Sequence, residues 1–177
     1  MKWILSLILT IIAAVLVGLG LYFADSLGFY LILLMPLLAG AIIGFSAVLL
    51  HIKQNPPALP LVVIAIIGSL IAMGVYWGGQ YNAYNQQLVE VVQDNDPRAT
   101  PEEINELIAD YQEEEFGSTG FTAFLAEYAE IGMSIGRPGS SSTGIPLEGN
   151  VLYGYWIVEI LVVVGVAIST ALRRRSV

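Results

Sequence analysis

The sequence predicts an all-α integral membrane protein with four transmembrane helices and an acidic, mostly helical extracytoplasmic segment between the third and fourth. Of its 177 residues, 56% are hydrophobic and only 12% are charged, which is unlike a soluble domain. Four windows carry almost no charge over the roughly 20 residues that a membrane-spanning helix needs. The chain thus divides into helices 1–3 in residues 1–78, the acidic segment in 79–150, and helix 4 with a basic tail in 151–177.

The four predicted spans differ little in composition. They cover residues 3–23, 29–50, 58–78 and 152–172, and Glu159 is the one ionisable residue inside them. The first span could be mistaken for a secretory signal peptide because Lys2 precedes it. Its apolar run is too long, however, and no small-residue cleavage motif precedes Asp25. We therefore interpret it as a retained first helix.

The positions of the cations predict the orientation of these helices. Five of the seven Lys and Arg residues fall on one side of the membrane: Lys2, Lys53, Arg173, Arg174 and Arg175. Because positive residues stay on the cytoplasmic side, we expect both termini to be cytoplasmic and residues 79–150 to be outside, in a bacterial plasma membrane. The three arginines would act as a membrane anchor near anionic headgroups.

The external segment carries most of the charge of the protein. Thirteen of the 15 acids lie in it against two arginines, a local net charge of -11. Thr100, Pro101 and Glu103 form an N-cap, a proline at the first helical position and a capping box, so a helix should run from there to about residue 115, ended by Gly117. Its expected apolar stripe consists of Ile104, Leu107, Ile108 and Tyr111.

A second external helix is predicted over residues 122–133. One of its sides gathers Phe124, Leu125, Tyr128, Ala129 and Gly132. Residues 80–93 would extend the third membrane helix outward, and residues 137–149, rich in proline, serine and glycine, should form a loop. An acidic cap repels anionic lipid, so we expect it to stand off the bilayer or meet a partner.

Glu159 is the strongest candidate for a functional residue. A carboxylate within a bilayer is costly, about 2.5–3.5 kcal/mol at mid-membrane, so it is a candidate proton carrier or cation ligand. Its possible hydrogen-bond partners are Tyr155, one turn earlier, and Tyr76 and Ser69 on the third helix. The competing interpretation is a structural hydrogen bond or a position near the outer interface.

Other patterns argue against chemistry carried by this chain alone. The G-x-S-x-G sequence at residues 132–136 lacks the preceding strand and the nearby histidine of a nucleophile elbow. The single histidine, His51, should be solvated in a cytoplasmic turn, and without cysteines neither a zinc nor a haem site is expected. We expect no enzyme activity and no cofactor, and the acidic charge argues against nucleic-acid binding.

Small residues recur at four-residue spacing on the second and third spans. They are Gly40, Gly44, Gly68, Gly74 and Gly78. Such pairs let helices approach closely in lipid, where packing replaces the hydrophobic drive. We expect them to pack the bundle, with contacts to another subunit as the alternative.

The layout of four spans with a long external loop before the last resembles that of tetraspanins in topology alone, because the cysteine motifs of that family are absent. The function that fits best is a structural or accessory subunit of a larger membrane assembly, whose partners are the lipid bilayer and other membrane subunits or a second copy. The alternative is a small transporter or ion-conducting oligomer that uses Glu159.

Overall fold

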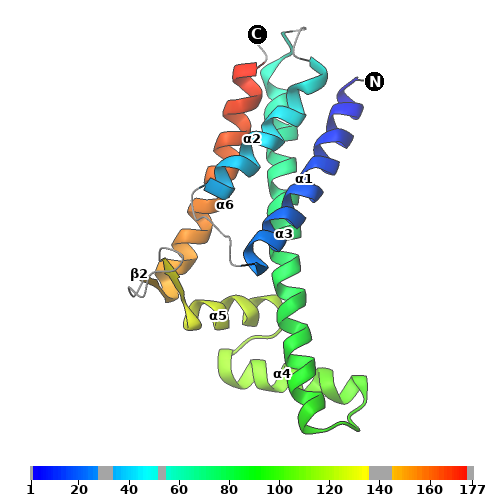
Figure 1. Ribbon diagram of the computed structural model, residues 1–177, viewed down its shortest axis with the longest axis vertical. Helices are drawn as coiled ribbons and strands as arrows, with labels where there is room; N and C mark the ends of the chain where they lie inside the picture. Colours follow the sequence, from blue (N-terminus) through cyan, green and yellow to red (C-terminus); the bar gives the residue numbers. More distant parts are fainter. Residues whose placement is uncertain (1, 28–33, 52–54, 136–144, 175–177) are drawn as a thin grey trace. The chain divides into compact units, whose positions relative to one another are not determined.

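The computed structural model describes residues 2–27, 34–51, 55–135 and 145–174 (Figure 1). The elements in chain order are α1 (Lys2–Ser26), α2 (Leu34–Val48), the 3-10 turn η1 (Leu49–His51), α3 (Ala58–Asn95), α4 (Pro101–Phe116), α5 (Phe121–Ile131), β1 (Met133–Ile135), β2 (Ile145–Leu147) and α6 (Gly149–Arg174). The chain forms two compact units. The first comprises Met1–Gly79 and Trp156–Val177, and the second comprises Gln80–Tyr155.

Four helices are long and apolar enough to cross a membrane: α1, α2 together with η1, α3 and α6. Their number and positions confirm the four predicted spans, although residues 29–33 of the second lie outside the described part of the chain. Large apolar side chains remain exposed along one side of α1, at Ile8, Ile12 and Leu16. A helix surface of this kind suits a lipid environment.

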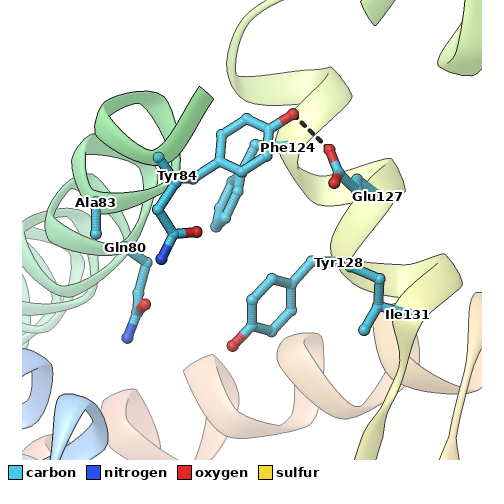
Figure 2. A pocket seen from close by; sticks show the side chains of 8 residues that line it. Gln80, Ala83, Tyr84, Phe124, Glu127, Tyr128 and Ile131 are labelled. Carbon is cyan, nitrogen blue, oxygen red and sulfur yellow. Dashed lines mark hydrogen bonds between the residues drawn. The ribbon is translucent and has the colours of Figure 1, made fainter. Parts of the chain in front are cut away.

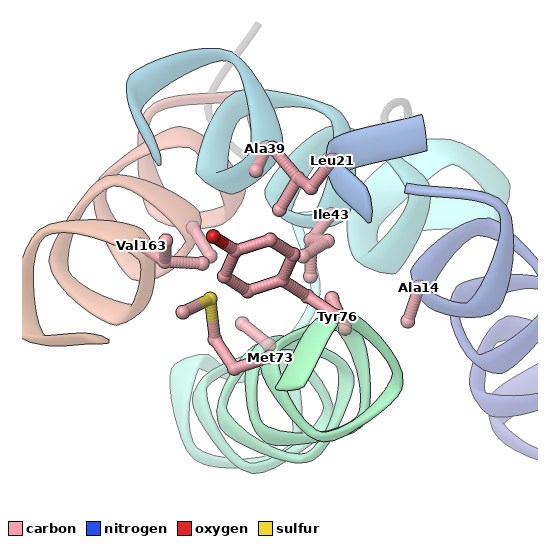
Figure 3. Close-up of a cluster of buried hydrophobic side chains, with 10 residues drawn as sticks. Ala14, Leu21, Ala39, Ile43, Met73, Tyr76 and Val163 are labelled. Atoms are coloured by element: carbon pink, nitrogen blue, oxygen red, sulfur yellow. The ribbon is translucent and has the colours of Figure 1, made fainter. Parts of the chain in front are cut away.

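The core of the first unit consists mainly of small side chains. Ala14, Ile43, Ala65, Ala72, Val163 and Ala167 are fully buried. Figure 3 shows the ring of Tyr76 surrounded by core residues such as Met73, Ile43 and Val163. Because alanine occupies so much of the core, the helix backbones lie close together, as is common in membrane bundles.

A group of buried hydroxyls joins α1 to α2. The Ser6 hydroxyl donates to the carbonyl of Ala47 at 2.5 Å, and the Ser46 hydroxyl lies 3.4 Å from that of Thr10. All three hydroxyl side chains are buried. Each finds an acceptor, so their burial in an apolar bundle does not leave an unsatisfied donor.

His51 is not the solvated turn residue that the sequence indicates. Only 3% of its surface is exposed, and its ring stacks on that of Trp3 with the centroids 4.1 Å apart. The turn η1 follows α2 directly and brings the imidazole against the start of α1. The prediction of a solvated histidine was wrong because it ignored this neighbouring aromatic ring.

The second unit begins where α3 continues past its apolar part. With 38 residues, α3 is roughly 57 Å long at 1.5 Å per residue, well beyond a hydrocarbon core of about 30 Å. The predicted extension of the third helix beyond its apolar span is therefore confirmed, and it reaches Asn95. Around this extension the unit contains α4, α5 and a short antiparallel hairpin.

The capping signals of α4 act as predicted. The Thr100 hydroxyl accepts from the amide of Glu103, and the Glu103 carboxylate accepts from the amide of Thr100. Pro101 is the first helical residue, and Gly117 ends the helix in the left-handed conformation with φ of 63°. Local sequence alone fixes both ends of this helix.

The buried side of α4 differs from the predicted stripe. Ile104 is buried, but Leu107 is 51% exposed and Tyr111 is 43% exposed, whereas the polar Gln112 is 2% exposed. The Gln112 carbonyl oxygen accepts from the amide of Gly120 at 2.8 Å. The buried side of α4 therefore includes Gln112, whose side chain makes a hydrogen bond. The spacing of apolar residues cannot predict a buried polar residue of this kind.

A short hairpin corrects one expectation about the region after α5. Gly132 ends α5 with φ of 75°, and β1 pairs antiparallel with β2, Met133 opposite Leu147. Residues 145–147 were predicted as loop and instead form a strand. The Gly-x-Ser-x-Gly sequence therefore lies at a helix-to-strand transition, the reverse of the order that a nucleophile elbow requires; its last glycine lies outside the described residues.

Candidate functional site

Glu159 lies on the buried side of α6. It is 4% exposed and follows the spacing of the buried residues Leu152, Trp156 and Val163. Its Oε1 atom has no hydrogen-bond partner within the described part of the chain. The Glu159 carboxyl thus lies inside the bundle of its own chain and not on an exposed helix surface.

A second carboxyl group lies near Glu159. Asp25, in the last turn of α1, is close enough for its charge to interact with that of Glu159. The Tyr76 hydroxyl on α3 donates to Oδ2 of Asp25 at 3.1 Å. Three helices therefore contribute to one polar cluster, which we call the acidic cluster: Asp25, Tyr76 and Glu159.

Sequence reasoning missed Asp25 as a member of this cluster. It placed the residue in the turn between the first two spans, whereas α1 continues to Ser26. No spacing pattern indicates this contact, because Asp25 is the next-to-last residue of α1 whereas Glu159 lies ten residues after the start of α6.

The other predicted partners of Glu159 are differently placed. The Ser69 hydroxyl is fully buried and donates to the carbonyl of Ala65 in its own helix at 2.8 Å. Tyr155 is half-buried one turn before Glu159 on α6. The Tyr76 hydroxyl binds a carboxylate of the acidic cluster, that of Asp25.

Two tryptophans pack beside the acidic cluster. The rings of Trp77 and Trp156 meet edge to face with centroids 5.0 Å apart, and Tyr76 packs against Trp77 at 5.3 Å. Trp156 is only 7% exposed. Aromatic rings beside the acidic cluster lower the local dielectric constant. A lower dielectric constant strengthens the electrostatic interaction between the two carboxylates.

The acidic cluster has a definite chemical capacity. Two carboxylates whose charges interact in a low-dielectric interior repel each other, and protonation of one of them or a cation near the pair removes that repulsion. Oε1 of Glu159, which has no partner among the described residues, can accept such a proton or cation. In the part of the chain that the structure describes, no group of three or more His, Asp or Glu side chains could hold a metal ion.

Three of the five predicted packing glycines lie at close helix contacts. A Cβ on Gly40 would come within 2.6 Å of the carbonyl oxygen of Val163, and one on Gly44 would overlap that of Ala167. A Cβ on Gly68 would meet Thr10 at 2.6 Å. Glycine is therefore needed where α2 approaches α6 and where α3 approaches α1.

The remaining pair, Gly74 and Gly78, does not lie at a close helix contact in the described part of the chain. A Cβ added at either residue would meet no described atom within 4 Å. Gly18, which the sequence analysis did not single out, instead lies against the carbonyl oxygen of Ala72. Spacing alone could not separate these cases, because open and packed glycines follow the same pattern.

An apolar groove runs between α1 and α2. Its volume is about 500 Å³, and its lining includes Ala13, Leu16, Gly20, Ala24, Met35 and Ala39. Every one of these residues belongs to the first unit. A Cβ on Gly20 would meet no atom within 4 Å, so nothing in the described chain fills the groove at this point.

The predicted basic anchor is described in part. Arg173 is exposed near the end of α6, Arg174 is the last residue of that helix, and Arg175 lies outside the described residues. Basic side chains at a helix end also complement the helix dipole.

Comparison of the chain with models of protein families, with curated proteins and with solved structures gave no match.

Proposed function

We propose that this protein is a multi-pass membrane subunit without catalytic activity, which assembles with another transmembrane helix through the groove between α1 and α2. The observation that carries the proposal is the groove itself, about 500 Å³ of apolar space between two helices that can each span a membrane. The helix would come from another subunit of the assembly or from a second copy of this chain.

The lining of the groove favours a helix over a lipid chain. Ala13, Gly20 and Ala24 follow one side of α1 at intervals of seven and four residues, and Ala39 faces them from α2. Small residues at such positions let a neighbouring backbone come close, and the gain comes from van der Waals packing. Within this chain, Gly40 and Gly44 accept α6 in the same manner.

The orientation that we propose follows the cations. With both termini in the cytoplasm of a bacterium and the acidic unit outside its plasma membrane, the basic residues of α6 meet the cytoplasmic leaflet. The groove would then be open to other membrane helices, and the external unit to soluble or membrane-bound partners.

Filling the groove tests the proposal. Gly20 lines the groove, and a Cβ added there meets no described atom within 4 Å, so we expect Gly20→Leu to keep the fold and to exclude the partner helix. The matched control is Gly165→Leu on α6, where an added Cβ also meets no atom and the groove is untouched. Native mass after extraction in mild detergent should fall for Gly20→Leu and stay unchanged for Gly165→Leu. Equal masses for both variants and the parent would contradict the proposal.

A second candidate function is favoured by one specific observation, the free Oε1 of Glu159 beside Asp25. We propose as the alternative a small transporter that holds a proton or a cation at the acidic cluster within each protomer. Glu159→Gln should then abolish proton- or cation-dependent flux in liposomes, while Glu130→Gln on the exposed side of α5 leaves it intact. Absence of flux in the parent protein would remove this candidate.

A further inference from the structure

The external unit contains a pocket of about 260 Å³ between the outward extension of α3 and α5 (Figure 2). Its lining includes Gln80, Tyr84, Phe124, Glu127, Tyr128 and Ile131. All of these residues belong to the second unit, so the pocket is a property of that unit alone. It combines aromatic rings, amides and one carboxylate, which is an unusual mixture for a space that merely separates two helices.

Aromatic rings form much of the pocket. Phe124 is 1% exposed, and its ring packs against Tyr84 at 5.3 Å and against Tyr128 at 5.6 Å. Figure 2 shows the ring of Tyr128 extending from α5 toward Gln80 on α3. The negative faces of such rings attract cations, and the attraction grows when water is excluded.

The carboxylate of the pocket is held in a fixed position. The Tyr84 hydroxyl donates to Oε2 of Glu127 at 2.5 Å, a bond that leaves Oε1 for another donor. The buried Gln112 amide in turn donates to the Tyr84 oxygen at 3.3 Å. Since Gln112 also accepts from the amide of Gly120, a chain of hydrogen bonds ties Glu127 to the backbone.

The electrostatic field of the external unit favours positive ligands. The segment from residue 79 to 150 holds 13 acids and two arginines. Its effect extends to neighbouring groups, since burial and the carboxylates of Glu127 and Glu115 raise the pKa of the Tyr111 phenol. A cation is concentrated at such a surface, and an anion is repelled.

We propose that this pocket binds the ammonium group of a small organic cation, with the aromatic rings around the cation and Glu127 as its counter-ion. A metal ion is a poorer match, because hard cations take six or more oxygen ligands and the pocket offers one carboxylate. The volume suits a ligand smaller than a typical drug molecule. The ammonium could belong to a free amine or to the headgroup of a zwitterionic lipid, because Gln80 directly follows the apolar part of α3.

Calorimetry on the full-length protein in a maltoside detergent tests the ligand class. Choline is the probe, and 3,3-dimethylbutan-1-ol is its uncharged analogue of the same shape. We expect saturable choline binding that weakens with added salt, and at least tenfold weaker binding of the alcohol. No binding of choline, or equal binding of both compounds, would overturn the proposal.

The source of the ammonium is resolved by a third titration with a water-soluble, short-chain phosphatidylcholine. Tighter binding of this lipid than of choline assigns the pocket to a headgroup, whereas tighter binding of choline assigns it to a free amine. Either result supports an ammonium site.

Two variants locate the binding in the pocket. Glu127→Gln keeps the shape of the side chain and removes its charge, so choline should bind about tenfold more weakly. Glu130→Gln removes the same charge from the exposed side of α5 and should change the affinity less than twofold. An equal loss of choline affinity in both variants would mean that choline responds only to the overall negative charge of the unit. That result would overturn the proposal of a specific site. Tyr128→Leu, which keeps an apolar side chain, should also weaken binding if the ring contacts the cation.

Discussion

Tyr76 connects the Asp25 carboxyl group of the acidic cluster to the core of the bundle. Its ring is 5% exposed among apolar side chains, while its hydroxyl donates to Asp25. A hydrogen bond to a charged group in such surroundings stabilises the folded protein more than one in water, although measured values in membrane bundles are modest. Tyr76 therefore contributes both packing and a directional contact.

Removing this hydroxyl should have a measurable effect. Tyr76→Phe keeps the ring and removes the hydroxyl that donates to Asp25, so we expect a loss of about 1 kcal/mol and a fall in melting temperature of about 2–4 °C. Thermal unfolding in detergent measures it. Tyr22→Phe is the control, because the Tyr22 hydroxyl makes no hydrogen bond to another described residue and its ring remains packed over Gly79. Equal melting temperatures for Tyr76→Phe and the parent would refute the role of the bond.

The chemistry of the acidic cluster was only half predictable from sequence. Glu159 stands out because it is the one acid in the middle of a span, and Tyr76 because it lies near the same depth on α3. Asp25 was assigned to a turn, since hydropathy marks the end of an apolar run and not the end of a helix. Which tyrosine oxygen meets which carboxylate depends on helix rotation, and no single-chain pattern encodes that.

Among the helices, the contact of α2 with α6 depends most on glycine. Gly44→Ala would drive a methyl group into the carbonyl oxygen of Ala167, and we expect a loss of about 1–3 kcal/mol from overpacking. The same substitution at Gly165, where the added methyl meets no atom, should be neutral or slightly stabilising. Unfolding of both variants in detergent makes the comparison. A Gly44→Ala protein as stable as Gly165→Ala would show that the two helices are further apart than described.

The start of α4 gives a prediction for the second unit. Thr100→Ala removes the capping hydroxyl and should destabilise the first turn of α4 by about 1 kcal/mol, seen as faster amide hydrogen exchange there. Thr119→Ala, an exposed residue just before α5, is the matched control. Unchanged exchange in Thr100→Ala would contradict the capping role.

The same cap should respond to acid. Hydrogen bonds from the backbone and side chain of Thr100 lower the pKa of the Glu103 carboxyl. A lowered pKa in the folded state means that the stabilisation is complete above the unfolded value of about 4.3 and is lost as the pH falls through the folded value. The part of the difference between the parent and Thr100→Ala that comes from the Glu103 carboxylate should therefore shrink as the pH falls below about 4, while the bond from the Glu103 amide to the Thr100 hydroxyl remains. A difference in exchange rate of the same size at pH 7 and in acid would count against this account.

At the scale of the whole molecule, the sequence consists of apolar spans and an acidic segment. This difference in composition predicts the division into two compact units. The four spans, the extension of α3 and the capped α4 all follow from hydrophobic runs and local signals, which depend on neighbouring residues only. The hairpin, the buried Gln112 and the stacked His51 do not, because each depends on a contact made by residues distant in sequence. The groove likewise follows from how two helices meet, which spacing does not specify.

The absence of cysteine permits a direct test of orientation. Single cysteines at Thr119 in the external unit and at Ser176 near the C-terminus give two reporters without a background. A membrane-impermeant maleimide should label Thr119→Cys in intact cells and Ser176→Cys only after permeabilisation. The reverse pattern would invert the proposed topology.

The claim that this protein works as part of a membrane assembly is tested most directly by the native mass of the parent protein. Extracted from its own membrane in mild detergent, it should migrate with a partner chain or with further copies of itself, at a mass well above its own 19.1 kDa after correction for detergent. A lone protomer at that mass, in the same detergent at low dilution, would contradict the claim.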